Sequence, residues 1–124
     1  MIELHLPYPP SVNHYWKTSG KRRYISAAGK AFRFDAHYAW HKAGSPTLGK
    51  ARVRVSVALY PPDRRRRDVD NSAKCVLDAL EAIGVFDDDE QVDDLRFVRC
   101  ERVEGGACIV MIEPIEQGEH DGTV

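Results

Sequence analysis

The chain has 124 residues, of which 43% are apolar and 30% are charged, as is usual for one soluble globular domain. Its 18 basic and 19 acidic residues give a formal net charge of −1, which excludes a strong overall attraction to nucleic acid or to an acidic membrane. No apolar run approaches the roughly 20 residues of a membrane helix, and the opening MIELHLPYPP lacks the features of a secretory signal, so we expect a cytoplasmic protein.

The first predicted elements in chain order are a short strand and a helix. Residues 2–6 (IELHL) predict a strand, which the following prolines end because they cannot donate to a sheet ladder. The mostly polar residues 12–23 predict a loop. Ser26 can cap a helix that runs to about Lys42. We expect the buried face of this helix to carry the side chains that recur at helical spacing, namely Ala31, Phe34, Tyr38 and His41.

The middle of the chain predicts a half-buried strand and a second helix. Residues 51–60 (ARVRVSVALY) alternate between apolar and more polar side chains, which is typical of a strand with one covered face. A helix is expected to begin near Asp70 or Asn71, both good capping residues, and to end at Gly84. Its apolar stripe consists of Val76, Leu77, Leu80 and Ile83.

The last predicted elements are two strands. Residues 95–103 and the continuously apolar residues 107–114 flank the turn EGG, so we expect a hairpin whose second strand is covered on both faces. Together these elements predict an α+β fold: a single domain, residues 1–114, with a mixed β-sheet and helices packed on it. An acidic and flexible tail, residues 115–124, is expected to follow. The three cysteines contain no C-x-x-C pair and are expected to be reduced.

Charge is concentrated in three segments despite the balanced total. Basic residues gather at 21–23 (KRR) and at 64–67 (RRRR), whereas residues 87–94 (DDDEQVDD) are acidic. The segment DRRRRDVDN, residues 63–71, sets guanidinium groups directly beside carboxylates. Such segregation can mark a site that handles a polyanion together with a cation.

The acidic residues around the second helix suggest a metal site. Asp68 and Asp70 precede this helix, and an aspartate among residues 87–89 could complete a cup of oxygen ligands of the kind that Mg²⁺ prefers. A metal ion there could activate water and neutralise charge on a phosphate, as phosphodiester hydrolysis requires. Lys74 lies one helical turn after Asp70, and its amine could stabilise negative charge in the transition state.

Simpler explanations compete with each of these assignments. Asp70 could be only a helix cap, Lys74 only its ion-pair partner, and the charged runs only solvated surface. An EF-hand starting at Asp68 is excluded, because Ala73 and Ala79 occupy the positions that need Gly and Glu. The pair His37 and His41 has no intervening Glu to form a zinc-protease motif.

The segment PPDRRRRDVDNSAKCVLDALEAIGVFDDDEQVDDL closely resembles the RusA family of Holliday junction resolvases, as do LPYPPSVNHYW and YISAAGKAFR in the N-terminal half. The resemblance covers nearly all of residues 2–113. It implies a homodimeric endodeoxyribonuclease that cuts four-way DNA junctions in recombination and repair, with Mg²⁺ or Mn²⁺ as cofactor. It also implies metal ligands at Asp68, Asp70 and Asp89 and a catalytic lysine at Lys74. The DNA-binding residues expected from the resemblance and the basic clusters are Arg64, Arg65, Arg66, Arg67, Lys21, Arg22, Arg23 and Asn71.

Two questions remain open from the sequence. Asp87, Asp88, Asp89 and Glu90 all offer a carboxylate, so the third ligand is not unique. The rival functions are a junction-binding architectural protein that does not cut and an interaction domain that does not bind DNA.

Overall fold

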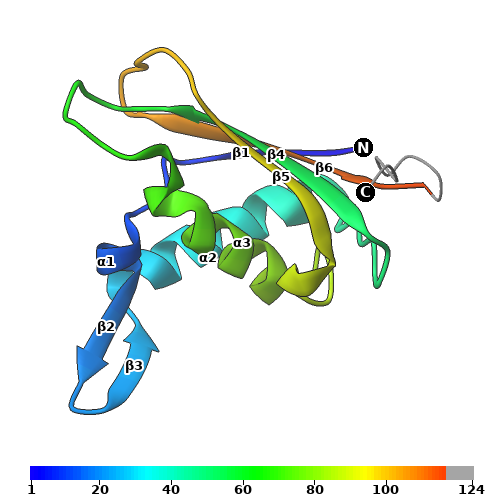
Figure 1. Cartoon of the computed structure of the whole chain (residues 1–124), viewed down its shortest axis with the longest axis horizontal. Coiled ribbons are helices and arrows are strands. Elements are labelled where there is room, and N and C mark those ends of the chain that lie inside the picture. Colours follow the sequence, from blue (N-terminus) through cyan, green and yellow to red (C-terminus); the bar gives the residue numbers. More distant parts are fainter. Residues whose placement is uncertain (117–124) are drawn as a thin grey trace, which may run out of the picture.

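A four-stranded mixed sheet forms the centre of the chain, of which the computed structural model describes residues 1–116 (Figure 1). The strand order is β1-β6-β4-β5; β5 runs parallel to β4, and the other two pairs are antiparallel. Both long helices, α2 and α3, lie on the same face of the sheet (Figure 1). The predicted α+β fold is thus confirmed. The bounds are β1 Ile2–Leu6, α2 Ala27–Lys42, β4 Val53–Tyr60, α3 Ala73–Ile83, β5 Val92–Arg99 and β6 Ala107–Pro114.

The core lies between this sheet and the helices. In β4 the alternation is confirmed, since Val53, Val55, Val57 and Leu59 are all buried. Strand β6 lies between β1 and β4, but only one of its faces is buried, because Met111 on the other face is 37% exposed. The expectation that this strand is covered on both faces was therefore wrong. The continuous apolar sequence of β6 reflects its central position in the sheet and does not indicate helices on both faces.

The predicted C-terminal hairpin was also wrong. Strands β5 and β6 do not pair, because β4 lies between them. The chain leaves β4, passes along one face of the sheet as α3 and returns parallel to β4 as β5. This is the usual geometry of a strand-helix-strand unit. Residues 100–106 then pass over the end of β4, where the Cys100 amide donates to the Leu59 carbonyl (2.7 Å).

Residues 12–23 are regular and not the predicted loop. Helix α1 (Val12–Tyr15) leads directly into the hairpin of β2 (Trp16–Ser19) and β3 (Arg22–Ile25), which extends away from the body of the protein (Figure 1). Gly20 supplies the positive φ of 61° that the turn requires. The polar composition misled the prediction because a two-stranded hairpin with most side chains in solvent has no apolar alternation.

Helix α2 begins as predicted but buries a different face. The Ser26 side chain accepts from the Gly29 amide (3.0 Å), which confirms the cap. The buried positions are Gly29, Phe32 and Ala36, whereas Phe34 is 71% and Tyr38 58% exposed. The buried face of α2 consists largely of small residues, so its large apolar side chains pointed to the wrong face of the helix.

Helix α3 matches its predicted stripe and its predicted end. Val76, Leu77, Leu80 and Ile83 are buried, and Gly84 closes the helix in the left-handed region with φ of 91°. The start differs, because the 3-10 helix η1 (Val69–Ser72) precedes α3 and contains both Asp70 and Asn71. Neither residue caps α3, so the capping explanation for Asp70 does not hold.

The remaining expectations concern the tail, the cysteines and membranes. Of the predicted tail, residues 117–124 lie outside the described part of the chain. Cys75, Cys100 and Cys108 are free thiols, as expected. Burial raises the pKa of Cys75 to about 11 and that of Cys108 to about 12. Over residues 1–116, none of the helices has the length and apolar character that spanning a membrane would need.

Candidate active site

One face of α3 lines a cavity of about 280 Å³. Lys74, Asp78 and Glu81 are spaced four and three residues apart, so they project from the same side of the helix. The cavity is completed by Asp89, which follows α3, and by Trp16 and Arg23 from the β2–β3 hairpin. Acidic and basic groups from α3, from the segment that follows it and from the β2–β3 hairpin therefore line one cavity.

Lys74 and Asp89, predicted to act together, are brought together in the structure. The Lys74 amine lies 3.9 Å from a carboxylate oxygen of Asp89. Glu81, Asp88 and Asp89 each offer an oxygen within 4.8 Å of the others. Burial raises the pKa of Glu81, and the neighbouring carboxylates of Asp89 and Asp88 raise it further. Three hard oxygen donors at this spacing have the chemistry that suits Mg²⁺.

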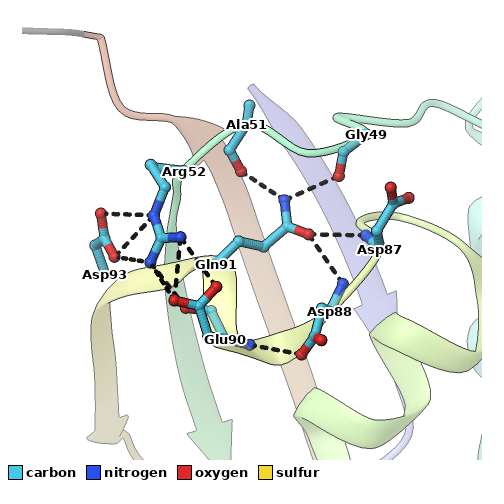
Figure 2. A network of polar contacts seen from close by, with 8 residues as sticks. All are labelled: Gly49, Ala51, Arg52, Asp87, Asp88, Glu90, Gln91 and Asp93. Atoms are coloured by element: carbon cyan, nitrogen blue, oxygen red, sulfur yellow. Dashed lines mark hydrogen bonds and ion pairs between the residues drawn. The ribbon is translucent and has the colours of Figure 1, made fainter.

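Among the four carboxylates of residues 87–90, Asp89 is the one that faces Lys74. The Asp88 side chain caps the short helix η2 (Asp89–Gln91) by accepting from the Glu90 amide (2.9 Å). Glu90 pairs with Arg52 (3.1 Å), away from the cavity, and Asp87 points away from this network (Figure 2). These contacts favour Asp89 over its neighbours as the predicted third ligand.

The position of Asp89 depends on Gln91, a residue that the sequence analysis did not single out. The Gln91 side chain is 4% exposed and accepts from the amides of Asp87 (3.0 Å) and Asp88 (2.9 Å) (Figure 2). Its own amide group donates to the carbonyls of Gly49 (2.9 Å) and Ala51 (2.5 Å). This buried side chain, together with the hydrogen bond from the Asp87 amide to the Gly49 carbonyl (3.1 Å), holds the acidic loop against the segment before β4.

Asp68 and Asp70 precede α3 in the sequence, and Asp89 follows it. Sequence order does not set their separation in space, because Lys74 in the first turn of α3 lies 3.9 Å from Asp89. Within residues 1–116, no group of side chains with ligand atoms inside 4.8 Å joins Asp68 or Asp70 to Asp89. The assignment of all three as ligands of one ion therefore stays a prediction.

Asp68 instead borders a second cavity, of about 390 Å³, beside the arginine loop. Its walls come from the proline-rich segment after β1, from α1 and from the start of η1. The lining residues are Tyr8, Pro9, Pro10, Ser11, His14, Arg65, Arg66, Arg67, Asp68, Asn71 and Ser72.

The four arginines of residues 64–67 are not equivalent. Arg67 donates to both carboxylate oxygens of Asp63 (2.7 and 3.1 Å) and lies over the ring of Tyr8. Arg65 also pairs with Asp63 (3.3 Å), and these bonds hold the pKa of Asp63 well below its usual range. Arg64 and Arg66 are exposed, and no hydrogen bond or ion pair engages either side chain in the described part of the chain. They are the two guanidiniums of the loop most available to an external anion.

Tertiary structure adds two basic residues to this loop that the sequence analysis missed. Arg99 donates to the Arg67 carbonyl (2.6 Å) and Arg102 to the Pro62 carbonyl (3.3 Å). Both follow from the parallel pairing of β4 and β5, which brings the ends of these strands to the same edge of the sheet. No local pattern in the sequence indicates this proximity.

A second missed feature is a polar network that joins the three helices beneath the cavity. Arg33 on α2 donates twice to Asp78 on α3 (2.9 and 2.7 Å), and the Tyr15 hydroxyl of α1 donates to the same carboxylate oxygen. Burial and the Asp78 carboxylate raise the pKa of Tyr15. Because Asp78 is already paired with Arg33, it adds little uncompensated negative charge to the cavity.

Comparison with known proteins agrees with this architecture. Residues 7–113 match the family model described as endodeoxyribonuclease RusA. A crossover junction endodeoxyribonuclease of Enterobacteria phage HK97 is 41% identical over 111 residues, covering 90% of this chain and 92% of the relative. The enzyme of the same name from Escherichia coli (strain K12) is 40% identical over 104 residues, covering 83% and 86%. The chain belongs to the RusA family of endodeoxyribonucleases.

Proposed function

We propose that this protein is a cytoplasmic, Mg²⁺-dependent endodeoxyribonuclease that resolves four-way DNA junctions by paired phosphodiester hydrolysis. The observation that carries the proposal is the approach of Lys74 to Asp89 (3.9 Å) in a cavity at the surface of a RusA-family chain. Mn²⁺ should substitute for Mg²⁺, because both prefer carboxylate and water ligands.

The proposed metal ligands are Asp68, Asp70 and Asp89. Glu81 and Asp88, whose oxygens lie near that of Asp89, are further donors at the same cavity. When bound, the ion supplies an activated water and offsets charge on the phosphate. Three ligand sets are to be distinguished: Asp68, Asp70 and Asp89 of one chain, Asp89 with Glu81 and Asp88 of one chain, or Asp89 of one chain with Asp68 and Asp70 of another.

The protein's own residues supply positive charge at two places. Lys74 is 77% exposed at its side chain, so its amine is free to reach a phosphate oxygen beside Asp89 and to stabilise charge that develops there. Arg64, Arg66 and the other basic residues of their loop bind the DNA backbone, with Lys21, Arg22 and Asn71 as further contacts. Phosphate contacts of this kind hold the substrate in position without reading its sequence.

We propose a homodimer as the active species. A four-way junction has near two-fold symmetry, and its resolution needs cuts in two opposed strands, so a pair of sites related by a two-fold axis fits the substrate. Light scattering of the purified protein should give a mass twice that of the chain. A mass of one chain at micromolar concentration, with full cutting activity, would contradict the proposal.

Incubation of the purified protein with a labelled four-way junction tests the function against its rivals. With Mg²⁺ we expect paired nicks in opposed strands, and with EDTA we expect a gel shift without nicks. Binding without nicks in Mg²⁺ would favour an architectural junction-binding protein. Absence of a gel shift at low salt would favour an interaction domain that does not bind DNA.

The Arg66→Ala variant tests the DNA-binding surface. Loss of one phosphate contact should weaken binding and reduce the slope of log K against log [salt] by about 0.9. The measurement is fluorescence anisotropy of a junction across a salt series. Lys50→Ala is the matched control, because Lys50 is an exposed lysine at the opposite end of β4. Equal slopes for the two variants would indicate that the arginine loop is not part of the DNA interface.

A further inference from the structure

The register of the β2–β3 hairpin separates Arg23 from its basic neighbours. Trp16 pairs directly with Ile25, so Arg23, two residues before Ile25, lies on the same face of the hairpin as Trp16. Arg22 and Lys17 lie on the other face. The cavity beside α3 is accordingly lined by Trp16 and Arg23 and not by Arg22 or Lys17.

Arg23 is held in place by the ring of Trp16. The central carbon of its guanidinium lies 4.4 Å from the centroid of that ring, within the range of a cation–π contact. Trp16 is half-buried and packs edge-on against the fully buried Tyr15, with ring centroids 5.1 Å apart. The support under Arg23 is therefore a fixed part of the core.

The base of the hairpin is also tightly attached to the body. The Ser26 amide donates to the Tyr15 carbonyl (2.9 Å), and Gly29 approaches so closely that a Cβ there would lie 2.6 Å from both Tyr15 and Ile25. Only glycine allows α2 to approach the hairpin in this way. Trp16 consequently lies at the attached base of the hairpin, and Arg23, which pairs with Thr18 nearer the tip, reaches back over its ring.

The guanidinium of Arg23 keeps its donors free. Across residues 1–116, no hydrogen bond or ion pair engages this side chain, and its one described contact is with the ring of Trp16. Its charge lies near α3, since it opposes the rise in the pKa of Cys75 that burial causes. Arg23 and Lys74 are the two cations among the cavity's lining residues.

We infer that Arg23, supported by Trp16, contacts the phosphodiester group that is cut, opposite Lys74. This inference rests on the proposed function and adds a residue with a specific role to it. In the hydrolysis, water adds to phosphorus, one phosphorus–oxygen bond breaks, and the proton of the water ends on the released oxygen. Arg23 and Lys74 keep their protons and bind the non-bridging oxygens, whose negative charge grows in the transition state. Trp16 is a positioning residue that holds the guanidinium for this contact.

Single-turnover cleavage of a four-way junction by four variants, at saturating protein and with Mg²⁺, tests the inference. Arg23→Ala should slow cleavage about 10²-fold, the loss typical of removing one donor to a developing oxyanion. Lys17→Ala, the matched control from the other face of the same hairpin, should cut nearly as fast as the wild type. Trp16→Leu should be slow, and Trp16→Phe should recover most of the rate because it restores an aromatic face.

Junction binding in Ca²⁺ is measured in parallel and should change little for Arg23→Ala, so that the loss appears in the rate and not in the affinity. Equal cleavage rates for Arg23→Ala and Lys17→Ala would overturn the role of Arg23 while leaving the proposed function intact. A Trp16→Phe variant as slow as Trp16→Leu would overturn the role of Trp16. Failure of the wild type to cut would instead overturn the proposed function itself.

Discussion

The Asp89→Asn variant should lose junction cleavage while still binding the junction. The substitution keeps the size of the side chain but removes the carboxylate that faces Lys74 and that we propose as a metal ligand. Loss of several kcal/mol of transition-state stabilisation corresponds to a rate reduction of about 10³-fold or more. Binding should be unchanged or tighter, because one negative charge near the phosphate has been removed. Single-turnover cleavage in Mg²⁺ and gel shift in EDTA measure the two effects separately.

Glu90→Gln is the matched control for Asp89→Asn. The two residues are adjacent, but the Glu90 carboxylate pairs with Arg52 outside the cavity (3.1 Å), so its neutralisation should leave cleavage intact. If Asp89→Asn cuts at the wild-type rate, or if Glu90→Gln is equally defective, the assignment of Asp89 as the reactive carboxylate of this loop is wrong.

Mixed dimers distinguish the three proposed ligand sets. Asp70→Asn and Asp89→Asn chains are expressed together with different tags, and the dimers that carry both tags are purified. If Asp89 acts with Asp68 and Asp70 of the partner, one of the two sites in such a dimer is intact, and nicking of one strand should return. If each site uses ligands from a single chain that include Asp70, no nicking returns. If Asp89 acts with Glu81 and Asp88 alone, the Asp70→Asn chain cuts by itself.

The second large effect is expected from Gln91→Ala. This change removes the buried side chain that joins the acidic loop to the residues before β4, and it leaves the Asp88 amide and the Ala51 carbonyl without that partner (Figure 2). The Asp87 amide still donates directly to the Gly49 carbonyl (3.1 Å). Each unsatisfied buried group costs about 1–3 kcal/mol, and partial access of water should hold the total loss in the free energy of unfolding to about 2–4 kcal/mol. Cleavage should also fall, because Asp89 lies in the released loop. Urea unfolding and the cleavage assay measure the two consequences.

Gln91→Glu separates the two halves of this network. A carboxylate can still accept from the amides of Asp87 and Asp88 but cannot donate to the carbonyls of Gly49 and Ala51. Its stability should therefore fall between the wild type and Gln91→Ala. Glu90→Gln serves again as the control, since its exposed side chain should cost little stability. A Gln91→Ala variant as stable as Glu90→Gln would show that the network does not hold the loop.

The parts of the fold predicted correctly are those in which one element carries its own signal. Alternation of Val53, Val55, Val57 and Leu59 defines one covered face of β4, and the apolar stripe of α3 together with Gly84 defines its packing and its end. The strands next to which β5 and β6 lie could not be predicted in this way. Nothing local in either strand indicates that β4 lies between them, and the short turn at residues 104–106 favoured the wrong topology.

The residues of the candidate site were predicted or missed for the same reason. Residue type and spacing pointed to Lys74 and to an aspartate among residues 87–89, and the family resemblance implied Asp89. The structure brings Lys74 and Asp89 together. Of the neighbours that complete the cavity, Glu81 shares a helix face with Lys74, and Arg23 belongs to the β2–β3 hairpin, which was predicted as a loop because its sequence is mostly polar. Gln91 was missed because the role of a buried glutamine depends on the backbone groups to which it hydrogen-bonds. Two of these, the carbonyls of Gly49 and Ala51, belong to a segment about 40 residues away.

The central claim is that a divalent ion binds at Asp89 beside Lys74, where the DNA strand is cut. A crystal structure with Mn²⁺ and a junction fragment tests this most directly, because the anomalous signal of manganese locates the ion without ambiguity. The account predicts an anomalous peak in contact with the Asp89 carboxylate and with a phosphate oxygen of the DNA that Lys74 also reaches. Manganese bound at Asp68 and Asp70 with Asp89 remote from it in both subunits would contradict the account.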